Sequence, residues 1–488
     1  MIAGTCFLAW LALVLRMAPR VPIEAALSGD TESYIAIASY RPPLYGWVLA
    51  AYQWATGGYD YLPLFQFLLT ALALLIFSVE LGRLLRSLWV GPLSILLVLM
   101  HVAIYDSPRL IMSEALFVAM ILAGLGLQFR YTRLDSLGDL LGAAIFFALA
   151  AVTRTTGMAF LLIPMLCAML DRRRGYWGGG LRACCAMLAT GLVLIMAMAG
   201  NHAKHGRFEI GSWTGMAVLG KGLLLLDESD VPVLPPPASA AAPEAARLRV
   251  LVDAQPNIAD RMRAQMQASE DLRFALFFPA AEENWPDWQI ADWRERGALA
   301  LTVGSRLIER HPLGFLQVWA RDWGSLVLYP MHWPAWASTE PPDKLLFPAC
   351  RLHDNCWALT RYDIPAPALA VMLAVSLTGA IGGVLLLLGA SGRVLRRRAL
   401  PTTILFWAMT LVLHTSLLVS AAFESGLVRY TVGLHVLGAA LLLWFLHVAW
   451  GHCQEWFRIG QFRMWREGRP ALIANNVDCP PIQDYVRR

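Results

Sequence analysis

A short polar segment follows the first apolar stretch of the chain and contains residue types that can catalyse the transfer of a chemical group. It reads Ser-Gly-Asp-Thr-Glu-Ser-Tyr around Asp30, and an Arg-Pro-Pro-Leu-Tyr sequence begins at Arg41. A carboxylate can act as a general base on a hydroxyl, and an arginine fork can hold a phosphate. Because ionisable side chains are costly next to membrane-like segments, this segment is the first candidate for a functional site.

The composition indicates what kind of protein positions these residues. Of the 488 residues, 57% are hydrophobic and only 15% are charged, whereas soluble domains have about 25% charged residues. Several apolar runs approach the roughly 20 residues that cross a bilayer as a helix. We therefore expect an all-α polytopic protein with the lipid bilayer as its surroundings. The net charge of +5 comes mainly from arginines between the apolar runs, so nucleic acid is not an expected partner.

The apolar runs predict about ten transmembrane helices. The connections rich in arginine, such as Arg172-Arg173-Arg174, alternate with connections poorer in it, and the positive-inside rule assigns the rich ones to the cytoplasm. The first run could instead be a cleaved signal peptide, but it lacks a basic start and a retained helix is favoured. The predicted spans are roughly 2–18, 63–82, 88–105, 112–129, 137–153, 156–170, 180–200, 365–390, 402–423 and 428–449.

Four regions follow from this pattern: an N-terminal transmembrane catalytic module with the first external loop, a large external loop forming a mostly helical cap, C-terminal transmembrane helices, and a cytoplasmic tail. Within the cap, the Pro- and Ala-rich stretch from Val233 to Pro243 predicts a linker or mobile loop. The four regions are residues 1–200, 201–364, 365–450 and 451–488.

Two cysteines lie close together in the cap. Cys350 and Cys356 enclose the sequence Arg-Leu-His-Asp-Asn, and an external compartment permits disulfides. A small local disulfide is the favoured interpretation. A metal site that adds His353 and Asp354 is the alternative, although one compact loop seldom supplies a full ligand set.

The predicted external ends of the spans hold further ionisable residues. Mixed carboxylates and guanidiniums beside an apolar groove suit group transfer from a lipid phosphate to a hydroxyl or amine. Structural roles remain open: Asp30 could cap a short helix, Arg41 could serve only to pair with Asp30, and Glu114 could cap the helix that follows Ser113. The full set is Asp30, Glu32, Arg41, Asp106, Arg109, Glu114, Arg154, Glu424 and Arg429.

Several of these motifs resemble those of GT-C glycosyltransferases, and most of all the bacterial enzymes related to protein O-mannosyltransferases and to the lipid A aminoarabinose transferase. Asp30 to Tyr34 with Arg41 to Tyr45 resembles the first external loop of that family. Met112 to Phe117 resembles its second acidic motif, and Val152 to Gly157 its Thr-Arg-Pro-x-Gly segment, with threonine at the proline position. The pair Arg429-Tyr430 resembles an Arg-Tyr pair before the last helices. The resemblance covers about 1–225 and 424–440.

The resemblance implies a polyprenyl-phosphate-linked sugar as donor, a lipid, glycan or protein as acceptor, and usually inversion at the anomeric carbon. It places the protein in a bacterial inner membrane with the site facing the periplasm. Asp30 would be the base, with Glu114 or Asp106 as the second acid. The sequence itself requires no metal or cofactor; the second acid could either orient the acceptor or help to bind a divalent cation. The implied phosphate ligands are Arg41, Arg154, Lys221 and Arg429, and the tyrosines that could contact phosphate or sugar are Tyr34, Tyr45 and Tyr430.

Two other functions compete with this one. A transporter or flippase would be expected to show repeated halves with paired broken helices, and the sequence shows neither. An O-antigen ligase or polymerase would also use lipid-linked sugars, but that class does not share the early Asp motif followed by Arg-Pro-Pro. The transferase hypothesis requires Asp30, Glu114, Arg154 and Arg429 to converge on one external cavity.

Overall fold

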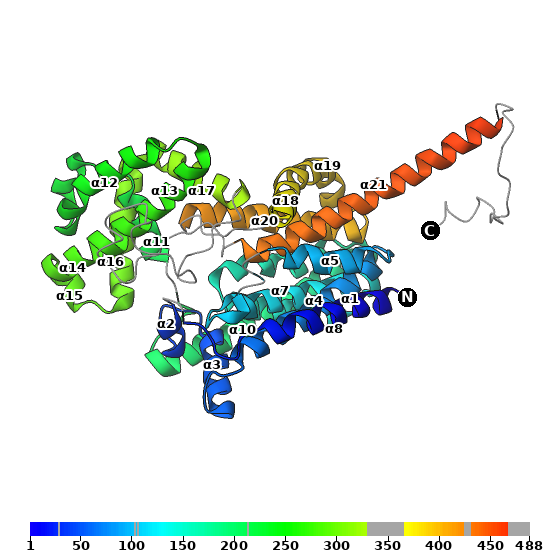
Figure 1. Ribbon diagram of the computed structural model, residues 1–488, viewed down its shortest axis with the longest axis horizontal. Coiled ribbons are helices and arrows are strands. Elements are labelled where there is room, and N and C mark those ends of the chain that lie inside the picture. The colour runs from blue at the N-terminus through cyan, green and yellow to red at the C-terminus, as the bar shows by residue number, and fades with distance from the viewer. Residues whose placement is uncertain are drawn as a thin grey trace. The chain divides into compact units, whose positions relative to one another are not determined.

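The computed structural model describes residues 1–27, 30–101, 104, 107–211, 214–328, 366–423 and 431–466. Within these ranges the regular structure is helical throughout, and the one β-type pairing is an isolated parallel bridge between Ala26 and Leu110. The all-α prediction is therefore confirmed for this part of the chain. Two compact units are distinguished, Met1–Leu442 and Leu443–Arg488, and Figure 1 shows their helices.

Seven helical segments of the described chain are long and apolar enough to cross a membrane, so the protein is a multi-pass membrane protein. One of these segments is built from α18 and α19, which a short π-helical stretch joins into a continuous run. The helices that form them are α1 (Ile2–Met17), α4 (Leu62–Leu84), α7 (Glu114–Leu134), α10 (Gly175–His205), α18 (Ala366–Leu377), α19 (Gly383–Leu395), α20 (Pro401–Phe423) and α21 (Val432–Arg466).

Three of the predicted spans correspond to shorter apolar helices. They are α5 (Val90–Leu99), α8 (Leu137–Ala151), and the 3₁₀ turn η3 (Thr155–Leu161) continued by α9 (Leu162–Leu170). The ten residues of α5 extend about 15 Å, half of the roughly 30 Å hydrocarbon core of a bilayer. The total of about ten spans therefore stays a prediction.

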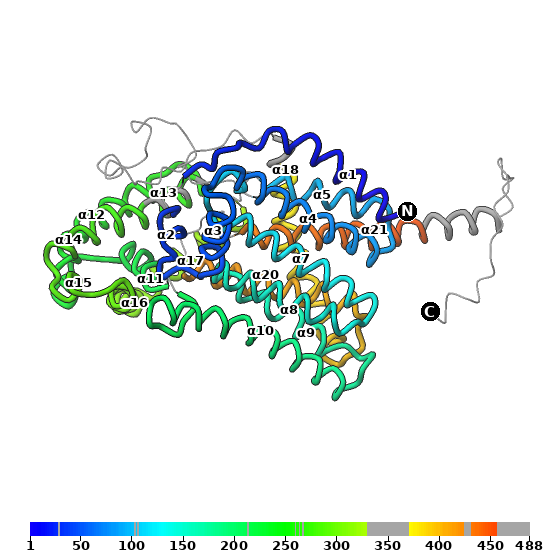
Figure 2. The backbone as a smooth tube through the Cα atoms, turned by 90° about the horizontal axis from the view of Figure 1, so that it is seen from below, coloured from blue at the N-terminus to red at the C-terminus, as the bar shows by residue number. Residues whose placement is uncertain are grey.

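Helix α7 lies at the centre of the apolar helices. It packs against α4 on one side and α8 on the other, while α10 covers α8 and α9 (Figure 2). In the most apolar stretch of α7, 83% of the residues are buried, against 28% for the stretch that contains α10. The outer helix α10 exposes the large apolar residues expected against lipid, such as Leu181, Leu188 and Leu192. The central helix α7 begins at Glu114.

The arginine-rich connections of this bundle meet at one end of it. Arg133 pairs with Glu80 near the end of α4, with 2.8 Å between nitrogen and oxygen. Arg173 donates to the carbonyl of Thr132 at 3.0 Å, and Arg397 donates to the carbonyl of Met169. Four connections that the positive-inside rule assigned to one side of the membrane are thus in contact with one another or with neighbouring helix ends.

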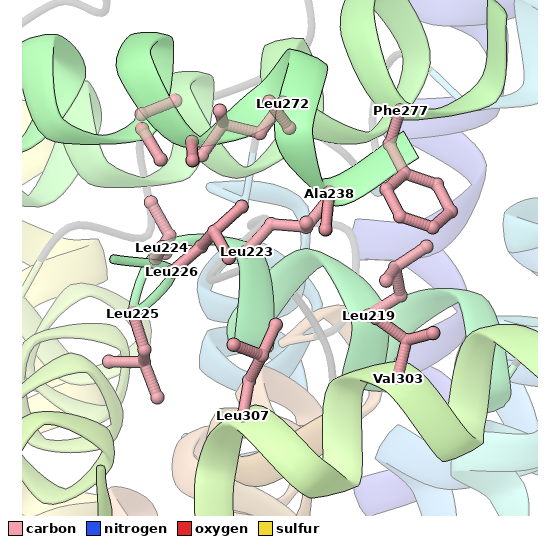
Figure 3. Packing of buried hydrophobic residues seen from close by; sticks show 14 of the residues in the cluster. Leu219, Leu223, Leu224, Leu225, Leu226, Ala238, Leu272, Phe277, Val303 and Leu307 are labelled. Carbon is pink, nitrogen blue, oxygen red and sulfur yellow. The ribbon is translucent and has the colours of Figure 1, made fainter. Parts of the chain in front are cut away.

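Residues 214–328 form a separate helical core within the first unit, which we call the helical insert. Its helix α11 packs chiefly against α16. Figure 3 shows Leu219 and Leu223 of α11 between Val303 and Leu307 of α16 on one side and Phe277 on the other. The insert contains α11 (Thr214–Leu223), α12 (Pro237–Asp253), α13 (Ile258–Glu270), α14 (Phe278–Asn284), α15 (Pro286–Ile290), α16 (Trp293–Arg310) and α17 (Pro312–Leu328).

The prediction of a linker between Val233 and Pro243 is wrong over most of that stretch, because α12 begins at Pro237. Proline is tolerated in the first turn of a helix, where its missing N–H would have no partner. Four alanines near the start of α12 are buried in the core of the insert. They are Ala238, Ala241, Ala242 and Ala245.

The predicted disulfide between Cys350 and Cys356 lies outside the described residues. The division of the chain into four regions also stays a prediction, because the boundary between the two compact units falls within α21.

Candidate functional site

Asp30 and Arg41 form an ion pair across a short loop. Asp30 immediately precedes the helix α2 (Thr31–Ile35), yet its side chain makes no capping hydrogen bond to that helix. Arg41 also donates from Nε to Ser33 Oγ at 3.1 Å. Asp30 is 5% exposed. The carboxylate is therefore held by Arg41 rather than used as a helix cap, and the pairing that the sequence left open is present.

Glu114 and Arg154 form a second ion pair from two other segments. Glu114 is the first residue of α7, and Arg154 stands just before η3 in an extended conformation. Arg154 Nη1 donates to Glu114 Oε1 at 2.5 Å and to Ser113 Oγ at 3.3 Å. Glu114 is completely buried, and its Oε2 atom has no hydrogen-bond partner within the part of the chain that the structure describes. This ion pair is therefore buried, and one carboxylate oxygen of Glu114 accepts no hydrogen bond from the described residues.

A tyrosine joins the two ion pairs. The Tyr34 hydroxyl lies 2.9 Å from Ser113 Oγ, and the Arg41 guanidinium stacks over the Tyr34 ring with its carbon 4.9 Å from the ring centre. Side chains from three distant segments therefore form one connected cluster. We call it the Asp30–Glu114 network; its members are Asp30, Arg41, Tyr34, Ser113, Arg154 and Glu114.

Tyr45 borders this network as a buried hydrogen-bond donor. Its ring meets that of Tyr34 edge-on with 5.1 Å between centres, and its hydroxyl donates to Gln66 Oε1 at 3.0 Å. Burial, and then the nearness of Tyr34 and Glu114, raises the pKa of Tyr45 well above its ordinary value. Tyr45 therefore stays protonated and polar at neutral pH.

Backbone contacts hold the three segments in register. The amide of Leu44, at the start of the helix α3 (Pro43–Thr56), donates to the carbonyl of Val152 at 3.1 Å. The turn that carries Arg154 lies directly on the end of α8: a Cβ atom at Gly157 would lie 2.6 Å from the backbone of Ala150. Glycine at this position therefore lets the Arg154 turn approach α8. This close approach explains why the Thr-Arg-Thr-Thr-Gly sequence ends in glycine.

Sequence reasoning missed residues that support the network. Gln66 of α4 accepts from Tyr45 and donates from Nε2 to the carbonyls of Pro108 and Leu110, both at 3.0 Å. Lys204, at the end of α10, donates to the carbonyl of Ala36 at 2.6 Å. A glutamine in a mostly apolar helix was a signal that the sequence offered. The target of Lys204 lies 168 positions away, and no local pattern reveals it.

The remaining predicted site residues lie elsewhere or outside the described residues. Lys221 of α11 pairs with Asp322 of α17 inside the helical insert. This pair is not one of the contacts that form the Asp30–Glu114 network. Asp106, Arg429 and Tyr430 lie outside the described ranges. Three of the four residues required to converge, Asp30, Glu114 and Arg154, belong to one connected cluster.

The network balances two carboxylates with two guanidiniums. A carboxylate in such a setting can accept a proton, and a guanidinium has five N–H donors, more than its carboxylate partner uses. The arrangement can thus bind an anion while it holds a base nearby. Within the described ranges no group of three or more His, Cys, Asp or Glu side chains is placed to hold a metal ion.

No known protein identifies this site by similarity. No family model, no curated protein and no solved structure matches the chain. The function is therefore argued from the geometry of the site and from the motifs of the sequence.

Proposed function

We propose that the protein is a membrane glycosyltransferase of the GT-C type, which moves a sugar from a polyprenyl phosphate to a hydroxyl or amine acceptor. The observation that carries this proposal is the Asp30–Glu114 network. The first loop, the start of α7 and the turn before η3 carry the three motifs that resemble the family, and their side chains form one connected cluster. Structural salt bridges alone would not require these particular segments to meet.

The proposed reaction assigns a step to each part of the network. Asp30 accepts the proton of the acceptor hydroxyl, and the acceptor oxygen forms a bond to the anomeric carbon of the sugar. The bond from that carbon to the phosphate oxygen breaks, and polyprenyl phosphate leaves with the electron pair. Attack opposite to the leaving group inverts the anomeric centre. Arg41 and Arg154 stabilise the departing phosphate charge, since guanidinium forks match phosphate oxygens.

Glu114 and the tyrosines have supporting roles in the proposal. Glu114 orients Arg154, and its second oxygen is available to accept a hydrogen bond from a sugar hydroxyl. Tyr34 and Tyr45 line the same cluster and present aromatic surface and hydroxyl groups. Asp106, Arg429 and Tyr430 are proposed to complete the site from segments outside the described residues, whereas Lys221 pairs with Asp322 in the helical insert and takes no step in the proposed reaction.

A groove beside the network supports a lipid-linked donor. A cavity of about 430 Å³ lies between α1, α4 and α5, and its walls are mostly leucine, isoleucine, alanine and methionine. Arg16, Arg20 and Arg109 also line it. The carbonyl of Arg109 accepts from the amide of Ala26 at 3.0 Å, which ties this groove to the loop that leads to Asp30. An apolar chain with an anionic head fits such a groove.

The proposed location is a bacterial inner membrane with the site facing the periplasm. Helix α4 begins after Tyr61, whose amide donates to the carbonyl of Ile23 in the first loop at 2.8 Å, and it ends near the arginine cluster at Arg133. The 23 residues of α4 extend about 35 Å. The arginine-rich end would be cytoplasmic by the positive-inside rule, so the Asp30–Glu114 network would face the opposite side.

The test is a transfer assay with the full chain in membranes. Labelled sugars on polyprenyl phosphate are supplied as a panel, and label is followed into lipid, glycan and protein fractions. Asp30→Asn is expected to reduce transfer by about 10²- to 10⁴-fold, the usual contribution of a general base, without loss of folded protein. The matched control is Asp60→Asn, an exposed carboxylate of the same loop, which should transfer like the wild type.

Two results would overturn the proposal. Full transfer by well-folded Asp30→Asn would remove Asp30 as the base. Movement of the lipid-linked sugar across the membrane without any transfer of label would favour a transporter instead.

A further inference from the structure

The helical insert contains a second cavity that is distinct from the Asp30–Glu114 network. Its volume is about 470 Å³, within the roughly 300–1,000 Å³ typical of small-molecule sites. The residues that line it belong to the segment after α11 and to α12, α13, α16 and α17. Its polar lining includes Arg249, Gln265, Arg310 and Arg321. Four helices that are apart in sequence thus place long polar side chains around one space.

The three arginines are held in place by bonds that use one nitrogen each. Arg249 Nη1 donates to the carbonyl of Leu226 at 2.7 Å. Arg310 Nε donates to Asp230 Oδ1 at 2.5 Å, and Arg321 Nη2 donates to Asp253 Oδ1 at 2.9 Å. A guanidinium has five donors in one plane. Within the described residues, these contacts anchor one nitrogen of each group, and a guanidinium has further donors that a ligand can use.

The cavity also borders a buried acceptor. Gln265 is 2% exposed, and its Nε2 donates to the carbonyl of Val318 and to Asp322 Oδ1, both at 3.0 Å. These two bonds define which end of the amide is oxygen. The Oε1 atom has no hydrogen-bond partner within the described residues. A buried acceptor without a partner costs about 1–3 kcal/mol, so the packing of α13 and α17 beside the cavity carries this cost.

The charges of the cavity are balanced rather than cationic. The three arginines are matched by three carboxylates, those of Asp227 and Asp253 in the lining and that of Asp230 behind Arg310 and His311. A simple anion is therefore not the best match. Apolar surface completes the lining, with Leu225 and Leu313 among its residues.

We propose that this cavity binds a saccharide. Sugar hydroxyls both donate and accept hydrogen bonds, which suits a lining of guanidiniums, carboxylates and amides, and the C–H face of a sugar ring packs on leucine. The proposal goes beyond the glycosyltransferase function and does not depend on it, because it concerns binding in the insert and not transfer at Asp30. A neutral sugar and a uronic acid share this chemistry, and the test separates them.

The experiment measures saccharide binding without turnover. The full chain in lipid nanodiscs is applied to an array of neutral and acidic oligosaccharides, and the glycans it retains are measured by titration calorimetry. Arg249→Gln and Arg321→Gln are each expected to weaken binding by about tenfold or more, since each removes charge-assisted hydrogen bonds. Leu313→Trp is expected to block binding without unfolding, because Leu313 is 75% exposed at the lining.

Two control variants test whether the glycan binds in this cavity. Arg306→Gln changes an exposed arginine of α16 that does not line the cavity, and it should bind like the wild type. Asp30→Asn should also bind like the wild type, whatever its effect on transfer.

Several outcomes would overturn the proposal. These are retention of no glycan on the array, unchanged binding by all three cavity variants, and loss of binding in Asp30→Asn, which would place the glycan at the other site. Complete displacement of the glycan by inorganic phosphate alone would show that the cavity is an anion site.

Discussion

Two buried charge clusters of this protein are built in different ways. In the Asp30–Glu114 network the charged residues stand on a loop and at helix ends, the Arg41 side chain is 19% exposed, and Glu114 keeps an acceptor without a partner in the described chain. In the helical insert, Lys221 and Asp322 stand within helices, and their side chains are 1% and 2% exposed. The first cluster is partly open to solvent, whereas the second pair is enclosed.

The difference indicates which cluster serves function and which serves stability. Buried charges are costly unless they are paired, so a closed pair surrounded by leucines needs only to be complete. A cluster that is partly open to solvent can be reached by a ligand, whereas an enclosed pair cannot. We therefore assign substrate chemistry to the Asp30–Glu114 network and structural support to Lys221 and Asp322.

The largest expected effect is on the closed pair. Asp322→Ala leaves the Lys221 ammonium buried without its carboxylate, and loss of one partner of a buried pair costs about 3–5 kcal/mol. We expect the variant to unfold at a much lower temperature or to be recovered in low yield. Thermal unfolding and size-exclusion chromatography of the purified protein measure this.

A double variant tests whether the pair has a second role. Lys221→Met with Asp322→Leu replaces both charges with apolar groups of similar size, which is often close to neutral for stability. We expect it to fold and to transfer sugar at the wild-type rate. A well-folded double variant without transfer activity would break the comparison, because Lys221 would then act on the donor phosphate as the family resemblance implies.

The second prediction concerns the open cluster. Arg154→Lys keeps the positive charge but loses the planar fork that contacts Ser113 and Glu114. A charge-assisted hydrogen bond contributes about 1.5–3 kcal/mol, so kcat/KM should fall about ten- to a hundredfold. The control is Arg182→Lys, because Arg182 forms a comparable pair with Asp135 at 2.5 Å in the arginine-rich end of the bundle.

The two lysine variants should separate activity from folding. Arg182→Lys should leave kcat/KM unchanged, and thermal unfolding should show both variants folded. Equal loss of activity in the two would mean that Arg154 contributes only general stability.

The sequence was sufficient to identify much of the open cluster. Asp30, Arg41, Glu114 and Arg154 are charged residues at the ends of apolar runs, and ionisable residues in that position are expensive. Their cost was visible without a structure, and so was the helical class of the chain. The bridging role of Ser113 was not visible, because a serine before a helix is most simply an N-cap, and the structure shows no capping bond from it.

The closed pair could not be found in the same way. Lys221 lies in a Gly-rich stretch whose helix α11 is buried by α16, and its partner Asp322 stands far along the chain in α17. Pairing over such a separation depends on how the helices of the insert pack, which propensity and periodicity do not determine. Packing likewise explains why the Pro- and Ala-rich stretch from Val233 to Pro243 is helical from Pro237 onward, where the sequence predicted a linker.

The third prediction compares a glycine in each region. A Cβ atom at Gly157 would lie 2.6 Å from Ala150 beside the Arg154 turn, and one at Gly304 would lie 2.6 Å from Val218 between α11 and α16. Overpacking of this kind costs about 1–3 kcal/mol. Gly157→Ala should lower kcat/KM strongly and the unfolding temperature only slightly, because the backbone shift that the added Cβ atom forces displaces Arg154. Gly304→Ala should lower the unfolding temperature alone. Activity loss in Gly304→Ala and none in Gly157→Ala would reverse the assignment of the two regions.

The smallest effect is expected at another carboxylate of the insert. Burial of Asp230 opposes its ionisation, but hydrogen bonds from Arg310 and His311 outweigh burial and lower the pKa of Asp230 below its ordinary value. The unfolded-state pKa is about 3.9. The ionised carboxylate therefore stabilises the fold at pH values above about 4, and this contribution is lost as pH falls through the lower pKa of the folded state.

Asp230→Asn measures this contribution. Arg310 is 44% exposed, so solvent screens the pair and the variant should lose only about 1 kcal/mol at pH 6. The difference in unfolding temperature between wild type and variant should shrink as the pH is lowered from about 5 toward about 3. A difference that stays constant over this range would show that folding does not lower the pKa of Asp230. Asp230 pairs with Arg310 and His311 and takes no part in the proposed transfer reaction. Transfer activity at neutral pH should therefore be unchanged, in contrast to every substitution in the Asp30–Glu114 network.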